Sequence, residues 1–592
     1  KVSANKMGRG EGCIFTQNPE DGSYTKEERA PNINQATIVF PEINGWSWYG
    51  WTDECYDCNL QQIIVNSDQN CALVSATFPY SLEARHESDG KIVKHNFHPG
   101  NRGEYLVNFD EDTLKISTTT QHDPVHSSEI WGPLVTLLVI LIALPFLRKL
   151  FEGVQSKPTE KAQFSGINEN LVQSQEEGNS EAPTKKAEPK TSGGGSRLNS
   201  LDTFRGMSLT IMIFVNYGGG GYWWLDHSSW DGLTVADLLF PWFMWIMGVS
   251  MALALKSRRT ARQTRMTMLQ QIARRALTLI AIGLFLDCPR ALSVWRFPGV
   301  LQYFAFSYTW CALAVVLTGS WDGEAGQLAQ AGLDAASEGT EDPWLDLRYF
   351  WREWPIILLA PTIWLLLSFG VSVPGCPTGY LGPGGLARDD GHCTGGAHRY
   401  IDILVFGKDH IYGEPTCFGA YNCQTPYDPE GLVGAFNAVL LTYLGLMVGR
   451  ALVYHSSPRA RVLRLGAHGC VCLLIGAILC GFKQHGGLIP VNKNLWSTSF
   501  VLVTAGGACW VLALFYLMID EYKIWNGAPF RYTGMNSIVV YAGSEVFQPY
   551  FPFSFATSRF HHWGHLATNV IGAACWNVIA TRMYQNRFFV KI

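Results

Sequence analysis

Three polar residues lie at the ends of two apolar segments in the stretch FVNYGGGGYWWLDHSSWDGLTVADLLFPWF (214–243). Asn216 ends the first apolar run, His227 follows in the connecting loop, and Asp237 lies near the start of the second run. An imidazole base, an amide that donates to an oxyanion and an orienting carboxylate are the components of an acyl-transfer site. A lone loop histidine is more often an ordinary surface group, so the hypothesis depends on the three residues meeting.

The residues around this set indicate why it would be exposed to a ligand or to water. Gly218 to Gly221 let the backbone turn sharply and approach a ligand closely, although a simple flexible turn explains them equally well. Pro241 cannot donate the hydrogen bond that the carbonyl of Asp237 would receive in a helix. A carboxylate and a free carbonyl in an apolar segment need either a hydrogen-bond donor or water. The alternative to a functional role for Asp237 is a purely structural pair with an arginine.

Further polar groups fall into two sets. Arginines at the starts of apolar runs suit either lipid phosphates or the phosphates of a soluble cofactor, and with an amide in a later run they form the candidate cofactor-binding set: Arg205, Arg274, Arg275 and Asn536. Arg296 lies at the opposite end of its segment and is not part of this set. The segment IPVNKNLWS (489–497) and a carboxylate in a later run suit an anionic sugar or a membrane-interface anchor, and they form the candidate substrate-binding set: Asn492, Lys493, Asn494, Trp496 and Glu545.

The apolar residues of this 592-residue chain are concentrated in long blocks. A membrane-spanning helix needs roughly 17 to 25 mostly apolar residues. The sequence predicts a polytopic α-helical membrane protein with eleven transmembrane helices, at 131–147, 201–217, 233–255, 276–287 with its flanks, 299–318, 355–373, 432–454, 463–482, 496–519, 534–548 and 566–584. The net charge of −4 gives no cationic field, so nucleic acid is not expected as a partner.

The basic loops 256–266 and 455–464 predict which side of the membrane is cytosolic. Alternating the spans from these loops places 1–130 and the loop containing His227 on the outer side, and the carboxyl terminus in the cytosol. Eight cysteines fall on the outer side, where disulfides persist. Proximity in sequence favours Cys376 with Cys393 and Cys417 with Cys423, and a metal site at ECYDC (54–58) is the weaker alternative because no second ligand pair follows. No metal is therefore expected.

The remaining segments define the domain organisation. Short alternating runs in 1–130 predict a small disulfide-containing β-sandwich on the outer side, with an irregular disulfide-stapled cap as the alternative. Residues 131–149 form the first transmembrane helix, and the Glu-, Lys-, Ser- and Gly-rich stretch 150–200 reads as a disordered cytosolic linker. Residues 201–592 then form a ten-helix domain. No signal peptide precedes the polar start, so we expect one to have been removed or to lie beyond this chain.

Several long motifs resemble the heparan-alpha-glucosaminide N-acetyltransferase family. They occur in the order LDTFRG (201–206), FVNYGGG (214–220), LTVADLLFPWF (233–243), PGCPTGYLGPGG (374–385), YDPEG (427–431), IPVNKNLWS (489–497) and GMNSI (534–538). The resemblance covers nearly all of the membrane region and, through ECYDC, the outer region loosely.

The resemblance implies an enzyme of the lysosomal membrane. Such an enzyme takes acetyl from cytosolic acetyl-CoA and transfers it to the terminal non-reducing α-glucosamine of heparan sulfate in the lumen. The family's catalytic histidine falls on His227, with its supporting amide and acid on Asn216 and Asp237. The family also suggests a homodimer in the lipid membrane. Two features depart from it: the chain has no Asn-x-Ser/Thr sequon, and Tyr303 stands where the family tends to have a basic cofactor contact.

An imidazole, with an ordinary pKa near 6.5, suits removal of a proton from a glucosamine ammonium in an acidic lumen. The same residues fit direct transfer or a ping-pong scheme through acetyl-His227, and we favour direct transfer. The rival interpretations are a transporter for an organic anion or sugar, and a membrane O-acyltransferase.

Overall fold

The computed structural model describes residues 16–17, 24–25, 34–41, 46–56, 58, 61–62, 71–86, 88, 90–110, 113–122, 198–260, 264–287, 294–319, 350–387, 392–423, 425–455, 457–557 and 562–590. The expected first span at 131–147 and residues 150–197 of the expected linker lie outside these residues. The last residues expected in the linker, Asn199 and Ser200, instead begin the first described helix. The description therefore concerns an amino-terminal β region and a helical region that begins at Leu198.

The amino-terminal region contains two four-stranded sheets. One has the order β10-β9-β3-β6 and the other β5-β4-β7-β8, and all pairings are antiparallel except that of β3 with β9. The strands are β3 (Gln35–Val39), β4 (Trp46–Thr52), β5 (Gln61–Gln62), β6 (Cys71–Ser75), β7 (Tyr80–His86), β8 (Ile92–Phe97), β9 (Glu104–Asp110) and β10 (Lys115–His122), with a separate pair β1 (Thr16–Gln17) and β2 (Tyr24–Thr25).

A shared apolar core joins the two sheets. Ile38 of β3 and Leu82 of β7 are fully buried in the same cluster, which also contains Trp48 and Val107. Alternating side chains point to opposite faces of a strand, so one face of each sheet supplies this core. The β-rich region expected from the alternating runs is therefore present, as two sheets that share one buried cluster.

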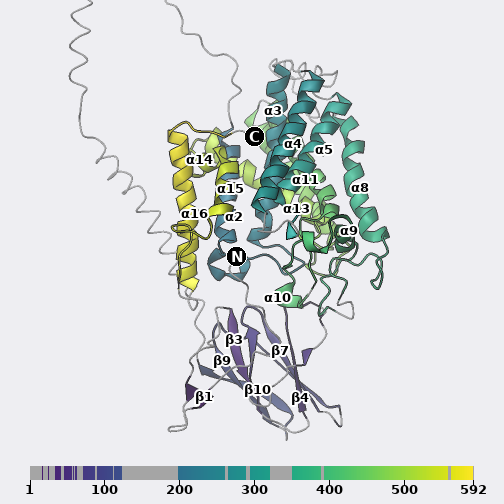
Figure 1. Ribbon diagram of the computed structural model, residues 1–592, viewed down its shortest axis with the longest axis vertical. Coiled ribbons are helices and arrows are strands. Elements are labelled where there is room, and N and C mark those ends of the chain that lie inside the picture. The colour runs from purple at the N-terminus through teal and green to yellow at the C-terminus, as the bar shows by residue number, and fades with distance from the viewer. Residues whose placement is uncertain are drawn as a thin grey trace, which may run out of the picture. The chain divides into compact units, whose positions relative to one another are not determined.

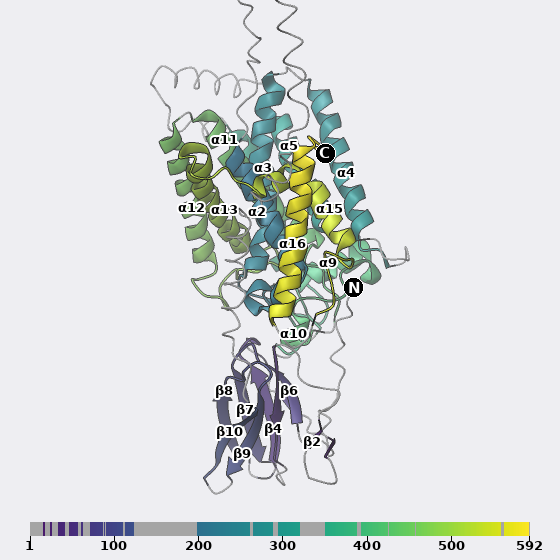
Figure 2. The same cartoon turned by 90° about the vertical axis from the view of Figure 1, so that its left-hand side faces the viewer.

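The helical region begins with α2 (Asn199–Asn216) and continues with α3 (Val235–Thr260), α4 (Arg265–Leu286), α5 (Val300–Thr318) and α8 (Trp354–Gly370), several of which are labelled in Figure 1. Further along the chain are α9 (Ala397–Phe406), α10 (Phe418–Tyr421), α11 (Leu432–Tyr454), α12 (Pro458–Leu479), α13 (Thr498–Phe515), α14 (Phe530–Met535), α15 (Ser537–Phe547) and α16 (His562–Gln585). Short 3-10 turns lie at Gly219–Gly221, Trp223–Leu225, Trp351–Glu353 and Lys408–His410, and a π-helical turn at Tyr516–Glu521 follows α13. Figure 2 shows α16 running beside α2.

A helix lies at each of the ten expected spans that fall within the described residues. Seven of these segments are long and apolar enough to cross a membrane: those at α3, α4, α5, α8, α11, α12 and α13. The helix α15 is apolar but short, and α2 and α16 do not reach the same hydropathy. The prediction of a polytopic helical protein with a β-rich amino-terminal region is confirmed, whereas eleven spans are not. The polar residues that α2 carries, including Asp202 and Arg205, explain its lower hydropathy.

Glycines permit close contact at the crossing of α3 and α11. A Cβ at Gly248 of α3 would lie 1.9 Å from the carbonyl oxygen of Thr442, and one at Gly445 of α11 would lie 2.1 Å from that of Trp245. Small residues let helix backbones approach in a membrane, where apolar surface alone does not drive helix association. This crossing fixes α3, which carries Asp237, against the buried centre of the bundle.

A buried ion pair ties α11 to the start of α8. The guanidinium of Arg450 donates to both carboxylate oxygens of Glu353, at 2.8 and 2.7 Å, and lies 3.8 Å from the ring centroid of Phe350. Both charged side chains are almost completely buried. Charges inside a membrane protein are paired in this way because hydrocarbon cannot solvate them.

A buried histidine should make the fold sensitive to acid. His398 of α9 is 3% exposed, its Nε2 lies 2.9 Å from Ser368 Oγ, and burial lowers its pKa to about 3. Because the unfolded chain takes up this proton below about pH 6.5 and the folded chain does not, the free energy of unfolding falls as pH drops toward 3. We expect this histidine to cost about 2 kcal/mol at pH 5 relative to pH 7.

Thermal unfolding of the full chain in detergent at pH 7 and pH 5 measures this effect. The drop in midpoint between the two pH values should be smaller in His398→Gln than in the parent. His392→Gln, at an exposed loop histidine, provides the control and should show the parent's drop. An equal drop in all three proteins would contradict the assignment.

Candidate active site

The carboxylate of Asp237 is the centre of the candidate site. Asp237 lies in the first turn of α3, is 1% exposed, and its Oδ1 is 2.7 Å from Nδ1 of His227. Its Oδ2 accepts hydrogen bonds from Ser228 N at 3.1 Å and from the backbone and hydroxyl of Thr234 at 3.2 and 3.0 Å. The carboxylate reaches back to the backbone N–H of Thr234, as the acidic residue of a capping box does, and the helix dipole also stabilises a negative charge in this first turn. The alternative of a structural Asp–Arg pair is therefore wrong.

The imidazole of His227 is held by its Nδ1 and remains accessible. With Nδ1–H donating to Asp237, Nε2 carries the lone pair that can accept a proton. The side chain of His227 is 32% exposed, whereas that of Asp237 is 1% exposed. The prediction that the histidine and the acid meet is confirmed by this geometry.

Lys493 joins the pair from a segment more than 250 residues away. Its Nζ lies 3.0 Å from Nδ1 and 3.3 Å from Nε2 of His227, and 3.7 Å from Asp237 Oδ1. Nearly equal distances to the two ring nitrogens place the ammonium beside the ring rather than in line with the Nε2 lone pair. We name Asp237, His227 and Lys493 the basic triad.

The loop containing Lys493 is held in place by buried amides. Asn492 donates to Asp231 Oδ1 at 3.0 Å and its own Oδ1 accepts from Leu495 N at 3.0 Å. Asn494 Oδ1 accepts from the hydroxyl of Thr416 at 3.1 Å, and the same hydroxyl lies 3.3 Å from the carbonyl of Ser229. Loops around 226–232, 416 and 492–497 therefore meet at one end of the bundle, as expected for loops on one side of the membrane.

Trp496 is fully buried, in contact distance of Phe240, Tyr303 and Phe500. It supports the loop from within and offers no ring face to a sugar in this structure. Asn492 and Asn494, at 0% and 5% exposure, are likewise committed to protein partners. Of the four residues predicted from segment 489–497, Lys493 alone contacts the histidine.

Asn216 and Glu545 form a second polar group. Asn216 Nδ2 donates to Glu545 Oε1 at 3.1 Å, and the carbonyl of Asn216 accepts from Gln548 at 3.1 Å. Among the described residues, no hydrogen bond joins this pair to the basic triad. The structure therefore brings His227 and Asp237 together, as expected. It pairs Asn216 instead with Glu545, a residue of the candidate substrate-binding set.

The four glycines form the predicted sharp turn. All four have positive φ, between 55° and 121°, which side chains rarely adopt. Asn569 of α16 fastens the turn, donating to Tyr217 O at 2.5 Å and accepting from Gly220 N at 2.8 Å. The close approach that the glycines permit here is to α16.

The candidate cofactor-binding residues have different surroundings. Arg205 donates to Ser250 Oγ at 2.5 Å and lies 3.4 Å from Asp202 Oδ1, so its guanidinium is already shared. Arg274 is exposed. Arg275 lies 4.4 Å above the ring of Tyr308, and its Nε is a buried atom without a hydrogen-bond partner in the described structure. A guanidinium with an unused donor fits a phosphate oxygen.

Asn536 contacts the end of the chain. Its Nδ2 donates to Phe588 O at 3.1 Å and its Oδ1 accepts from Val590 N at 3.3 Å. The amide therefore has two backbone partners, which a cofactor would have to displace.

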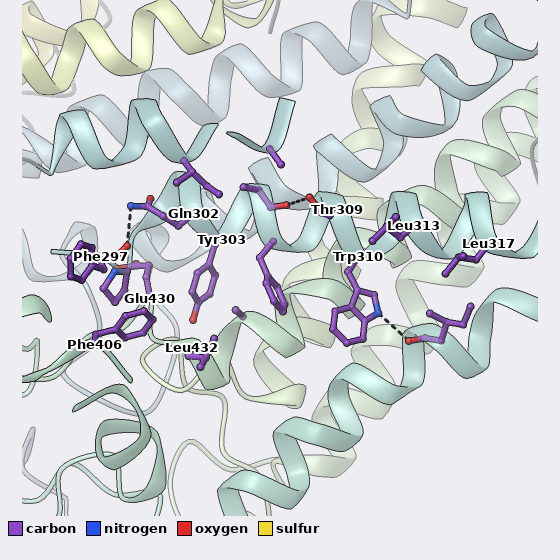
Figure 3. A pocket seen from close by; sticks show the side chains of 17 residues that line it. Phe297, Gln302, Tyr303, Thr309, Trp310, Leu313, Leu317, Phe406, Glu430 and Leu432 are labelled. Carbon is purple, nitrogen blue, oxygen red and sulfur yellow. Dashed lines mark hydrogen bonds between the residues drawn. The ribbon is translucent and has the colours of Figure 1, made fainter. Parts of the chain in front are cut away.

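An apolar cavity of about 690 Å³ is lined in part by Tyr303 (Figure 3). The ring centroid of Tyr303 also lies 5.2 Å from that of Trp496. The cavity is lined by residues of α4, α5, α8, α9 and α11, including Gln302 and Trp310, and by Phe297 and Glu430, which precede α5 and α11. It contains no member of the basic triad. Tyr303, which stands where a basic residue was expected, donates its hydroxyl to Gly431 O and closes one wall of this cavity.

Three disulfides lie near this end of the bundle. Cys376 pairs with Cys393 and Cys417 with Cys423, as proximity in the sequence predicted. Cys55 pairs with Cys58, which replaces the alternative of a metal site at ECYDC. Among the described residues there is no group of three or more potential metal ligands.

The analysis of the sequence missed Asp231, Thr234 and Glu54. Asp231 organises Asn492 and lies 3.4 Å from His485, and Thr234 is signalled by the T-x-x-D spacing to Asp237. Glu54 accepts a hydrogen bond from Ser229, two residues after His227. No local pattern signals Glu54, because it belongs to the amino-terminal region.

Two curated proteins match this chain along most of its length. A heparan-alpha-glucosaminide N-acetyltransferase from Homo sapiens is 36% identical over 581 residues, which cover 92% of this chain and 85% of that protein. The protein of the same name from Mus musculus is 35% identical over 591 residues, which cover 94% of this chain and 88% of that protein. No family model matches the chain.

Proposed function

Because this chain belongs to the heparan-alpha-glucosaminide N-acetyltransferase family, we propose that it transfers acetyl from acetyl-CoA to the amine of a terminal α-glucosamine of heparan sulfate. The observation that carries the site assignment is the 2.7 Å contact between Asp237 Oδ1 and His227 Nδ1 at an exposed imidazole. We place the reaction at a lysosomal membrane, with the basic triad on the lumenal side and the carboxyl terminus in the cytosol. We further propose that the enzyme is a homodimer.

In the proposed mechanism His227 removes the proton that prevents the amine from attacking. Nε2 accepts this proton from the glucosamine ammonium, and Asp237 stabilises the imidazolium through Nδ1–H. The amine nitrogen then bonds to the thioester carbonyl carbon, the carbon–sulfur bond breaks, and His227 gives its proton to the coenzyme A sulfur. The second proton on the nitrogen passes to the neutral His227 and from there to water, which leaves the neutral amide. Asn216, whose second amide hydrogen is not used by Glu545, donates to the carbonyl oxygen as negative charge develops.

Lys493 has an electrostatic role in this mechanism. Its ammonium lies within 3.3 Å of both ring nitrogens, so an imidazolium would place two positive charges in contact. The negative charge of Asp237 attracts both the imidazolium and the ammonium, and so offsets the repulsion between them. Lys493 therefore places a positive charge beside the imidazole and 3.7 Å from Oδ1 of the carboxylate that orients it.

The cytosolic arginines suit the phosphates of acetyl-CoA. Arg275, with its unused Nε–H, is the first candidate for a phosphate contact. Arg205 lies in α2, and Arg274 lies in α4. These residues would bind and orient the nucleotide, while the reacting carbonyl must reach the basic triad.

His227→Ala should lower kcat by about 10²- to 10⁴-fold, because it removes the base. The measurement is release of coenzyme A that depends on added α-glucosamine. His392→Ala, at an exposed histidine, serves as the control and should keep the parent's rate. Undiminished activity of His227→Ala would reject the assignment, and substrate flux without coenzyme A release would favour a transporter.

Lys493→Met should lower kcat by about tenfold, or about 1.4 kcal/mol, because it removes the ammonium that lies beside the imidazole and 3.7 Å from Asp237 Oδ1. Lys493→Arg keeps the positive charge and should restore most of the parent's rate. An unchanged kcat in Lys493→Met would contradict the role of Lys493.

Direct transfer predicts no stable acetyl-enzyme. Incubation of the full chain with acetyl-labelled acetyl-CoA and no sugar, followed by peptide mass spectrometry, should leave His227 unlabelled. Label retained on His227, and released when α-glucosamine is added, would establish the ping-pong scheme instead.

A further inference from the structure

A loop of the amino-terminal β region lies against the loop that contains His227. The carboxylate Oε1 of Glu54 accepts a hydrogen bond from the hydroxyl of Ser229. Asp226, whose Oδ1 accepts from His227 N at 2.8 Å, lies close enough to Glu54 for the two charges to repel. One carboxylate therefore accepts a hydrogen bond from the backbone of His227, and the other accepts one from Ser229, two residues along the same loop.

The position of Glu54 is fixed by its neighbours on both sides. Glu54 N donates to Thr52 Oγ1 at 3.1 Å. Cys55 is 5% exposed and packs in one apolar cluster with Trp230 and Tyr421, and it forms the disulfide with Cys58. These contacts hold Glu54 at the loop more firmly than a surface side chain on a free turn would be held.

The next residue adds two contacts to the membrane region. Tyr56 N donates to the hydroxyl of Tyr421 at 3.3 Å, and the ring of Tyr56 stacks on His485 with centroids 4.4 Å apart and an angle of 7°. His485 in turn lies 3.4 Å from Asp231, which also anchors the loop of Lys493. The β region therefore contacts the same loops that assemble the basic triad.

Glu54 is a partly buried carboxylate that lacks a cation. Within the described residues, no lysine or arginine forms an ion pair with Glu54. Removal from water, the strongest influence, raises the pKa of Glu54, and the charge of Asp226 raises it further, while the hydrogen bond from Ser229 opposes both. A desolvated carboxylate is stabilised when a positive charge is brought beside it.

We propose that Glu54, with Asp226, forms a recognition site for the ammonium group of the acceptor sugar, so that the amino-terminal β region takes part in substrate binding. This inference rests on the proposed function, in which a cationic amine must come to His227 before it is deprotonated. The two carboxylates attract the cationic form, and His227 then receives its proton. The selection acts on the charge of the acceptor and not on the acetyl donor.

Glu54→Gln tests the proposal, because it keeps an acceptor for Ser229 and removes the charge. In the full chain in detergent, with saturating acetyl-CoA, KM for α-glucosamine should rise about fivefold, the size expected for a partly exposed ion pair. The kcat and the KM for acetyl-CoA should stay within about twofold of the parent. The KM difference should narrow as pH falls, because burial raises the pKa of Glu54 and the carboxylate therefore takes up a proton at a higher pH than an exposed glutamate does.

Two further variants separate charge from structure. Ser229→Ala removes the hydrogen bond and leaves the carboxylate, so its KM for α-glucosamine should stay near the parent value. Glu414→Gln removes an exposed carboxylate from another loop and should change nothing. An unchanged KM in Glu54→Gln, or an equal rise in Ser229→Ala, would overturn the recognition role.

The proposed function is judged separately, by the parent protein. If the parent releases no coenzyme A in response to α-glucosamine, the acetyltransferase assignment fails before Glu54 is considered. If the parent is active and the variants are indistinguishable, only the role of Glu54 fails.

Discussion

A single buried carboxylate organises the candidate site. Asp237 accepts hydrogen bonds from the imidazole of His227, the backbone of Ser228 and both donors of Thr234. These contacts satisfy a charge that would be costly in an apolar bundle, and they also fix the ring orientation that leaves Nε2 open. Stability and chemistry therefore depend on the same interaction, because a helix that must start at Val235 also has to place this carboxylate.

The loops at this end of the bundle supply what the helix cannot. Asp231, Thr416 and the buried amides of Asn492 and Asn494 hold the Lys493 backbone in a fixed path. The disulfides Cys376–Cys393 and Cys417–Cys423 constrain the neighbouring segments. The resulting ammonium beside the imidazole is a long-range consequence of loop folding, and it gives the base an environment that a solvent-exposed histidine lacks.

Local signals in the sequence predicted the elements and part of the site. Apolar length located the helices, and Asn216, His227 and Asp237 were recognisable because ends of apolar runs rarely carry such groups. The partnership of His227 with Asp237 spans ten residues and follows from one loop. Contacts between distant segments could not be predicted from local patterns. The composition of IPVNKNLWS did not indicate that Lys493 contacts the imidazole whereas Trp496 is buried. The role of Asn569 at the glycine turn and of the chain end at Asn536 also depends on tertiary packing.

The central claim is that chemistry occurs at the exposed side of His227, and a structure with coenzyme A and α-glucosamine bound tests it most directly. We expect the amine nitrogen within hydrogen-bond distance of His227 Nε2, and the coenzyme A sulfur on the same side of the ring. A sulfur bound in the apolar cavity that Tyr303 lines, or an amine that contacts neither His227 nor Asp237, would contradict the account.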